Sequence, residues 1–230
     1  MIADGDRILV AVSGGVDSLT LMDRLFRLRR NARVRFDLFG VLIDEGFGID
    51  RSPLLAEAAR RGWPLEIVET PIAGLLHEKG DVRRPCALCS RLRRGFLYRR
   101  AAELDCAKIA LGHHRDDLCV TFLMNLLRGG GLRTMGPNVP ADAGRRRVIR
   151  PLCYAPKSLI ETVAESLGFP ADEKCPHAAR LEARGDRAYL EKLLEELESR
   201  FPGAGNAFLH SLADLRPDHL LDRRFFGTSG

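Results

Sequence analysis

Apolar positions along the chain alternate between short continuous runs and longer amphipathic stretches. Short runs rich in Val, Ile and Leu are typical of strands buried on both faces of a parallel sheet. Five strands are expected, at 7–12, 36–44, 65–70, 108–112 and 147–152. Helical periodicity predicts helices at 16–30, 52–61, 87–104 and 116–127. Strand and helix in alternation predict an α/β fold: a parallel five-stranded sheet with helices on both faces and a ligand site at the carboxyl ends of its strands.

The rest of the chain divides into a loop and a helical extension. Residues 127–147 are rich in Gly, Pro and Arg and predict a mobile loop. Beyond residue 156 the pattern is helical, and an apolar stripe within 189–201 indicates core packing. We therefore expect an α/β domain at 1–155 and a C-terminal helical extension at 156–230.

Composition narrows the class of protein. No segment approaches the roughly 20 apolar residues of a membrane helix, and the first residues lack the basic region of a signal peptide, so we expect no membrane partner and a cytoplasmic protein. The 36 Lys and Arg residues exceed the 31 Asp and Glu residues, and the net charge of +5 suits an anionic partner such as nucleic acid.

A glycine turn, AVSGGVDS at 11–18, follows the first predicted strand and opens the first helix. Glycines let backbone N–H groups close around phosphate oxygens, and the helix N-terminus adds partial positive charge. The sequence matches neither the GxxxxGK[ST] loop nor GxGxxG. The alternative to a phosphate site is a simple Gly-Gly turn followed by a capping Asp17.

Two further strand ends carry candidate groups. ALGHHRDD (110–117) lies at the end of the fourth predicted strand. Its two carboxylates, Asp116 and Asp117, stand at a helix start, where a simple N-terminal cap is the alternative to a ligand-binding role. LID (42–44) ends the second strand.

Six cysteines are present, and two of them lie three positions apart in an arginine-rich stretch, RRPCALCSRLRRG. The C-x-x-C spacing of Cys86 and Cys89 is shared by zinc sites, iron–sulfur sites and redox dithiols, so spacing alone does not choose between them. A closed zinc site of Cys86, Cys89, Cys175 and His177 is the structural alternative. The other three, Cys106, Cys119 and Cys153, are expected to be small buried apolar residues.

The SGGxDS turn resembles the pyrophosphate loop (PP-loop) of the N-type ATP pyrophosphatases, which cleave ATP between the α and β phosphates and adenylate a substrate oxygen. That resemblance implies ATP and Mg²⁺, with Mg²⁺ held by Asp17 and Asp117. It implies the following ATP-binding residues: Ala11, Val12, Ser13, Gly14, Gly15, Asp17, Ser18, Ile43, Gly112 and His113.

The segments PCALCSRLRRGFLYRRAAELDCAKIALGHHRDD, VIRPLCYAPKSLI and LRPDHLLDRRFFG together resemble the tRNA 2-thiocytidine biosynthesis family (TtcA). The resemblance implies ATP-dependent sulfur transfer to a cytidine in the tRNA anticodon loop with a 4Fe-4S cluster. Cys86, Cys89 and Cys175 would hold the cluster, leaving one iron open to take up sulfide. The chain departs from the family at two points: Val16 replaces the lysine of SGGKDS, and Ala178 replaces a fourth cysteine.

The family resemblance also assigns roles to basic residues and partners. Arg93, four residues beyond Cys89, matches the position of a basic catalytic residue in related thiolases, and Asp117 is the second expected catalytic residue. Arginines cluster around the cysteine helix and in the 127–147 loop, and this clustering suggests a phosphate-backbone footprint in which Arg94, Arg128 and Arg133 contact RNA; the alternative is a solvated helix face. The expected partners are tRNA, a sulfur donor such as a cysteine desulfurase, and a second copy in a homodimer. Two other functions remain open: thiolation or amidation of a small molecule on the same fold, and a zinc-stabilised nucleotide-binding module.

Overall fold

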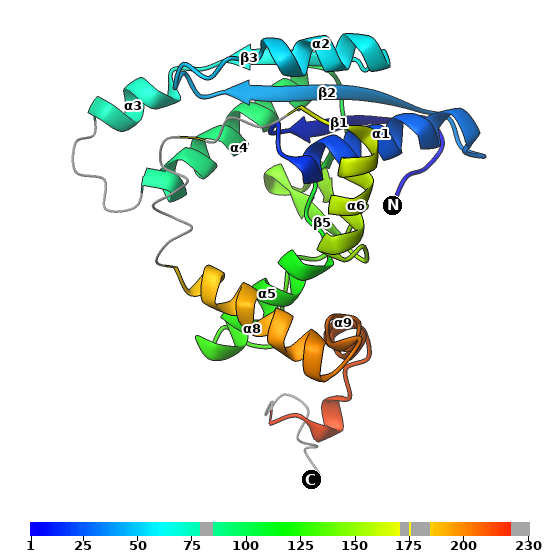
Figure 1. Ribbon diagram of the computed structural model, residues 1–230, viewed down its shortest axis with the longest axis vertical. Coiled ribbons are helices and arrows are strands. Elements are labelled where there is room, and N and C mark those ends of the chain that lie inside the picture. The colour runs from blue at the N-terminus through cyan, green and yellow to red at the C-terminus, as the bar shows by residue number, and fades with distance from the viewer. Residues whose placement is uncertain (79–84, 171–174, 176–184, 222–230) are drawn as a thin grey trace. The chain divides into compact units, whose positions relative to one another are not determined.

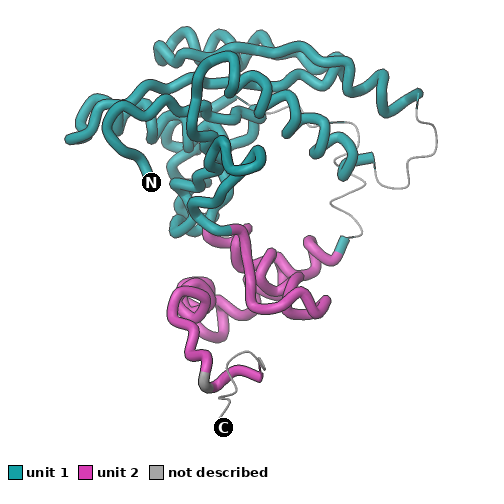
Figure 2. The backbone as a smooth tube through the Cα atoms, turned by 180° about the vertical axis from the view of Figure 1, so that it is seen from behind, with its two compact units in different colours: residues 1–114, 136–185 teal, residues 115–135, 186–230 magenta. Residues whose placement is uncertain are grey.

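The computed structural model describes residues 1–78, 85–170, 175 and 185–221. Arg83, Arg84, His177 and Ala178 lie outside the described residues. The chain divides into two compact units, Met1–His114 with Gly136–Gly185 and Arg115–Met135 with Asp186–Gly230 (Figure 2). The expected boundary at residue 155 stays a prediction.

The first unit is built on a six-stranded sheet (Figure 1). Its strands are β1 (Asp6–Val12), β2 (Phe36–Asp44), β3 (Leu65–Glu69), β4 (Lys108–Ala110), β5 (Asn138–Ala141) and β6 (Arg146–Ile149). They lie in the order β3-β2-β1-β4-β6-β5, and every pair is parallel except β5 with β6. The α/β class is confirmed, and the predicted strand at 147–152 is β6.

The strand that the sequence did not predict is β5, which falls in the Gly- and Pro-rich segment taken for a loop. Its sequence, NVPA, is short and contains Pro140. A proline lacks the N–H that a central strand needs, so it is found at sheet edges. Because β5 is the edge strand and pairs antiparallel to β6, the expectation of five parallel strands is corrected to a mixed sheet of six.

Both faces of the sheet are covered, as expected from alternating side chains in buried strands. The helices of this unit are α1 (Val16–Asn31), α2 (Ser52–Arg61), α3 (Ile72–Glu78), α4 (Pro85–Glu103) and α6 (Lys157–Leu167). Ile8 and Val10 of β1 join one apolar cluster with α1 and α2. Leu9 joins the opposite cluster with α3 and α4. These two clusters pack the helices against the two faces of the sheet. The ends of the strands and the starts of the helices therefore have defined positions relative to each other.

The direction of strand succession changes between β1 and β4. From β1 the chain adds β2 and β3 on one side, and β4 and β6 lie on the other. In open parallel sheets, ligands bind outside the carboxyl ends of the strands at such a switch point. The residues that follow β1 and β4 are therefore the first place to look for a site.

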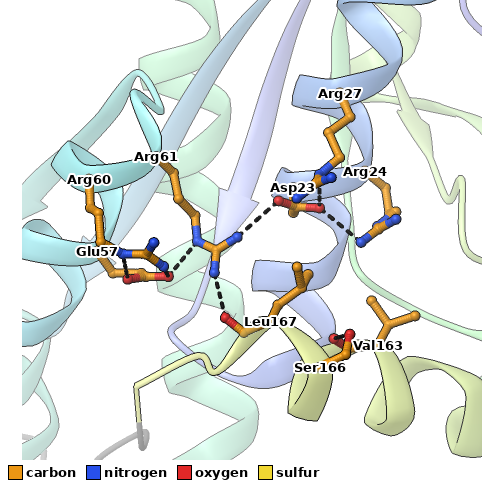
Figure 3. Close-up of polar contacts among 9 residues, drawn as sticks. All are labelled: Asp23, Arg24, Arg27, Glu57, Arg60, Arg61, Val163, Ser166 and Leu167. Atoms are coloured by element: carbon orange, nitrogen blue, oxygen red, sulfur yellow. Dashed lines mark hydrogen bonds and ion pairs between the residues drawn. The ribbon is translucent and has the colours of Figure 1, made fainter.

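A buried ion network joins α1, α2 and the end of α6 (Figure 3). Arg61 donates to Asp23 (3.2 Å), to Glu57 and to the carbonyl oxygen of Leu167 (2.7 Å). Its guanidinium also lies 4.8 Å from the ring centroid of Phe169. Arg24 and Arg27 also pair with Asp23, and Arg60 with Glu57, so Arg61 links two multiply paired carboxylates to the last carbonyl of α6.

The second unit is helical, with α5 (Arg115–Leu127), α8 (Asp186–Arg200) and α9 (Ala204–Ala213). Leu190 and Leu194 of α8 are buried, which confirms the core of the predicted stripe. Phe201, also assigned to the stripe, is exposed, because it follows the last residue of the helix. Phe122 of α5 meets Phe208 of α9 edge to face, with ring centroids 5.9 Å apart.

Across the described residues, no helix combines the length and the apolar character that crossing a membrane requires.

Candidate functional site

The glycine turn at 13–15 links β1 to α1 at the switch point. Gly14 has a φ of +100°, a conformation that side chains rarely adopt, and Gly15 is the N-cap of α1. Ser18 in the first turn is buried; its hydroxyl donates to the Gly15 carbonyl oxygen (2.8 Å) and accepts from the Ser13 N–H (3.1 Å). The Ser18 hydroxyl thus bridges the two ends of the turn, and the N-terminus of α1 adjoins it. Val16, which stands where the family has lysine, is exposed.

Gly112 brings the chain after β4 against the first turn of α1. A Cβ atom at residue 112 would lie 3.1 Å from the Asp17 carbonyl group and from the Ser18 nitrogen, closer than side chains normally approach backbone. His114 is buried, and its Nε2 lies 4.0 Å from Asp17 Oδ2. Arg150 donates from Nε to His113 Nδ1 (3.2 Å). The two sequence motifs therefore meet in the first unit.

Three of the expected ATP-binding residues, Ala11, Val12 and Ile43, lie in strands. Ala11 and Val12 end β1 and pair with Val41 and Leu42 of β2. Ile43 is buried in the apolar cluster shared with α3 and α4, so its side chain packs in the core and only its backbone could contact a ligand.

Cys86, Cys89 and Arg93 lie at helical spacing on one face of α4. Burial raises the pKa of both thiols, and the negative charge of a Cys175 thiolate raises both further. Among the described residues, no three His, Cys, Asp or Glu side chains have the arrangement of a metal site. Thiolates suit both iron–sulfur clusters and zinc, so the donor set fits the predicted cluster.

Glu45, the residue after β2, was not selected from the sequence. It is 8% exposed and accepts from Arg93 Nη1 (3.0 Å), and Arg51 Nη2 lies 3.7 Å from its other oxygen. Its charge is the second cause, after burial, that raises the pKa of Cys89, whereas Arg93 lowers it. Glu45 belongs to no recognised sequence motif. The one feature of the sequence that could have pointed to it is its position directly after the LID segment (42–44) at the end of a predicted strand.

Asp117 lies in the first turn of α5, in the second unit. Its side chain is 14% exposed and forms an ion pair with Arg187 of α8, a residue that the sequence reading missed. Arg187 also donates to Glu191 (3.0 Å). The expected role of Asp117 in holding Mg²⁺ stays a prediction.

The arginines expected to meet RNA are exposed, but two of them have protein partners. Arg94 is exposed on α4. Arg128 pairs with Asp186, and Arg133 Nε lies 3.4 Å from Asn125 Oδ1. Surface pairs of this kind contribute little to stability.

The other three cysteines are buried, as expected. Burial raises the pKa of Cys106 to about 11 and of Cys119 to about 12, and it raises the pKa of Cys153 as well. They pack as small apolar side chains.

The chain is similar to known proteins over nearly its whole length. A PP-loop domain profile matches residues 78–175. The tRNA-cytidine(32) 2-sulfurtransferase of Anaeromyxobacter sp. (strain Fw109-5) is 42% identical over 240 residues, covering 97% of this chain and 74% of the relative. The enzyme of the same name from Aeromonas hydrophila subsp. hydrophila is 38% identical over 230 residues, covering 98% of this chain and 75% of the relative.

The fold is shared by a solved tRNA thiolase structure. The U34-tRNA thiolase NcsA from Methanococcus maripaludis, determined with its 4Fe-4S cluster, superposes with a TM-score of 0.69 at 19% identity. The match covers 94% of this chain and 74% of the thiolase.

Proposed function

This chain belongs to the tRNA-cytidine(32) 2-sulfurtransferase family and is an ATP-dependent tRNA-thiolating enzyme; from that premise we propose that it replaces the 2-oxygen of a tRNA anticodon-loop cytidine with sulfur. The cytidine oxygen attacks the α-phosphate of ATP and pyrophosphate leaves. The resulting adenylate makes the oxygen a leaving group, and a sulfur nucleophile then displaces AMP.

The glycine turn is the proposed pyrophosphate site. The N-terminus of α1 presents backbone N–H groups and partial positive charge, and Gly14 and Gly15 leave the mouth of the turn without side chains. Gly112 supports this proposal because it allows the β4 end to approach the same helix turn. Asp17 and Asp117 are each proposed to bind Mg²⁺, since carboxylates suit this hard cation.

Cys86, Cys89 and Cys175 are the residues that would hold an iron–sulfur cluster. When bound, such a cluster supplies a soft sulfur nucleophile for the activated carbon. The raised pKa values of Cys86 and Cys89 favour the protonated thiols in the metal-free chain, and metal binding would release those protons.

Arg93 is the proposed catalytic cation. It lies one helical turn beyond Cys89 on α4, and its charge partly offsets the rise in the pKa of that thiol, which supports a cation close to the proposed sulfur ligands. A fixed positive charge there would stabilise negative charge that develops on the phosphoryl group in the transition state.

The tRNA substrate is proposed to meet the exposed basic residues Arg94, Arg128 and Arg133. A cysteine desulfurase as sulfur donor and a homodimer are further proposals, based on family resemblance.

The observation that carries the proposal is the meeting of the glycine turn with Gly112 at the start of α1, in a member of a tRNA sulfurtransferase family. The test has two arms. Iron and acid-labile sulfide are measured after anaerobic purification, with stoichiometric zinc and no iron as the contradicting result. Mass spectrometry of tRNA nucleosides from a deletion strain should show loss of 2-thiocytidine. An unchanged level would shift the substrate to a small molecule.

A further inference from the structure

Glu45 is held in place by backbone contacts before its side chain makes any. Thr70 donates from both its N–H (2.9 Å) and its hydroxyl (2.8 Å) to the carbonyl oxygen of Asp44. The N–H of Ala73 in α3 donates to the carbonyl oxygen of Glu45 itself (2.8 Å). The end of β2 is therefore fixed to the start of α3, and the Cα position of Glu45 is well defined.

Two arginines from different elements share the Glu45 carboxylate. Arg93 of α4 donates to Oε1 at 3.0 Å, and Arg51, the N-cap residue of α2, faces Oε2 at 3.7 Å. The Glu45 side chain is only 11% exposed, so it is screened from water more than a surface pair is. Because each oxygen faces a different guanidinium, rotation of the carboxylate is restricted from both sides.

The group carries one net positive charge and lies beside a thiol of the proposed sulfur site. Two guanidinium groups and one carboxylate sum to +1, and Cys89 precedes Arg93 by one turn on the same face of α4. Glu45 uses a single nitrogen of Arg93, and a guanidinium has five N–H donors. The remaining donors of Arg93, whose side chain is 43% exposed, can meet phosphoryl oxygens while Glu45 keeps its hold.

We propose that Glu45 is a positioning residue that aligns Arg93 for the phosphoryl group, with Arg51 fixing the far oxygen of the carboxylate. This inference rests on the proposed function. Without an ion-pair partner, the long side chain of Arg93 would sample many rotamers. A cation that is not aligned with the phosphoryl group stabilises the transition state little. Glu45 does not touch substrate; it acts through Arg93.

The test compares Glu45→Gln with a matched control, Glu66→Gln. Glu66 accepts from Arg100, two turns further along α4, at 2.7 Å, so its loss removes an acid–arginine pair on the same helix outside the site. Single-turnover thiolation of tRNA should fall about 10- to 100-fold in Glu45→Gln, with the KM for ATP changed by less than about threefold. Glu66→Gln should thiolate like the wild type.

A double-mutant cycle separates positioning from direct catalysis. If Glu45 acts only through Arg93, then Glu45→Gln combined with Arg93→Ala is no slower than Arg93→Ala alone. If the fold-losses in thiolation rate of the two single variants multiply in the double variant, the proposal is overturned. Iron and sulfide contents equal to those of the wild type are expected in Glu45→Gln, and loss of the cluster in that variant would overturn it as well, because Glu45 would then support the cysteines.

A readout without turnover keeps the inference distinct from the proposed function. Phenylglyoxal modifies unpaired arginines, and peptide mass spectrometry reports each site. Arg93 should be modified several-fold faster in Glu45→Gln, whereas Glu66→Gln should accelerate Arg100 only. Equal modification of Arg93 in wild type and Glu45→Gln would sink the Glu45 inference even if tRNA thiolation is observed. Absence of thiolation by the wild-type enzyme would instead contradict the proposed function.

Discussion

Arg187 at the start of α8 forms an ion pair with Asp117 at the start of α5, although 70 residues separate them in the chain. Asp186 pairs with Arg128 just beyond the other end of α5, so two adjacent residues of α8 hold both ends of α5 with opposite charges. The pairs lie within the second unit and orient the aspartate that family resemblance places in catalysis.

Replacing Arg187 with Gln should lower activity more than it lowers stability. Half of the Arg187 side chain is exposed, so the free energy of unfolding should fall by about 1 kcal/mol or less. The kcat for tRNA thiolation should fall about tenfold, because Asp117 loses the group that orients it. The control is Arg216→Gln, which removes an exposed pair with Asp214 (3.6 Å) in the same unit. Activity loss that only parallels unfolding, as measured by urea denaturation, would contradict the prediction.

Replacing Gly112 with Ala should disturb the nucleotide site. The added Cβ would lie 3.1 Å from backbone atoms of Asp17 and Ser18, so the first turn of α1 must shift. We expect a stability loss of about 1 to 3 kcal/mol and an ATP affinity lowered about tenfold or more, measured by equilibrium binding. Gly74→Ala in α3, where a Cβ meets no atom within 4 Å, is the control and should leave ATP binding unchanged. Wild-type affinity in Gly112→Ala would count against a nucleotide site at this turn.

The strongly patterned parts of the fold could be predicted from the sequence. The strands β1, β2, β3, β4 and β6 are apolar runs, and the glycine turn joins β1 and α1 as its sequence indicates. The local hydrophobic pattern determines these elements, because each residue's conformational preference agrees with the preferences of its neighbours. The edge strand β5 was missed because NVPA has neither length nor alternation, and only pairing with β6 makes it a strand.

The side-chain partners of the site could not be predicted, because they depend on contacts between distant segments. Glu45 and Arg93 are 48 residues apart, and neither residue's neighbours reveal the other. Sequence motifs singled out the cysteines and the glycine turn as candidates. The motifs did not indicate that Glu45, directly after β2, would accept a hydrogen bond from Arg93 of α4. That contact requires α4 to pack against the face of the sheet that carries the β2 side chains.

Replacing Arg61 with Met should strongly destabilise the first unit. Arg61 is about 90% buried and contacts both Asp23 and Glu57, so its loss leaves these carboxylates with only their more exposed partners, Arg24 and Arg27 for Asp23 and Arg60 for Glu57 (Figure 3). Removing one member of a buried ion network costs about 3 to 5 kcal/mol. Arg60→Met, which removes an exposed partner of the same Glu57, is the control and should cost much less. Equal losses in the two variants, measured by urea denaturation, would show that burial of the network is unimportant.

The same network should make stability fall in acid. Hydrogen bonding from Arg60, supported by Arg61, holds the pKa of Glu57 below its ordinary value of 4.5 despite burial. A carboxyl whose pKa is lower in the folded state contributes stability above pH 4.5, and this contribution is lost as the pH falls through the folded-state pKa. In Glu57→Gln, the free energy of unfolding should therefore decline less steeply below about pH 4.5 than in the wild type. Parallel curves for the two proteins would contradict this assignment.

The six cysteines should fall into two classes by their reactivity toward iodoacetamide at about pH 8. Burial raises the pKa of Cys119 to about 12, so only about one thiol in ten thousand is ionised there, and this thiol should react slowly in every state of the protein. Cys86, Cys89 and Cys175 are partly exposed. In anaerobically purified enzyme they should be protected if they hold a cluster, and iron chelation should make them react first.

Cys153, which is buried and has a raised pKa, is the internal control and should behave like Cys119 before and after chelation. Quantitative peptide mass spectrometry distinguishes the sites. If Cys175 is labelled equally fast with and without chelation while Cys86 and Cys89 change, the third thiol is not a ligand and the donor set must be completed from elsewhere. If none of the three changes, the thiols of α4 hold no metal and the sulfur chemistry proposed for this site is wrong.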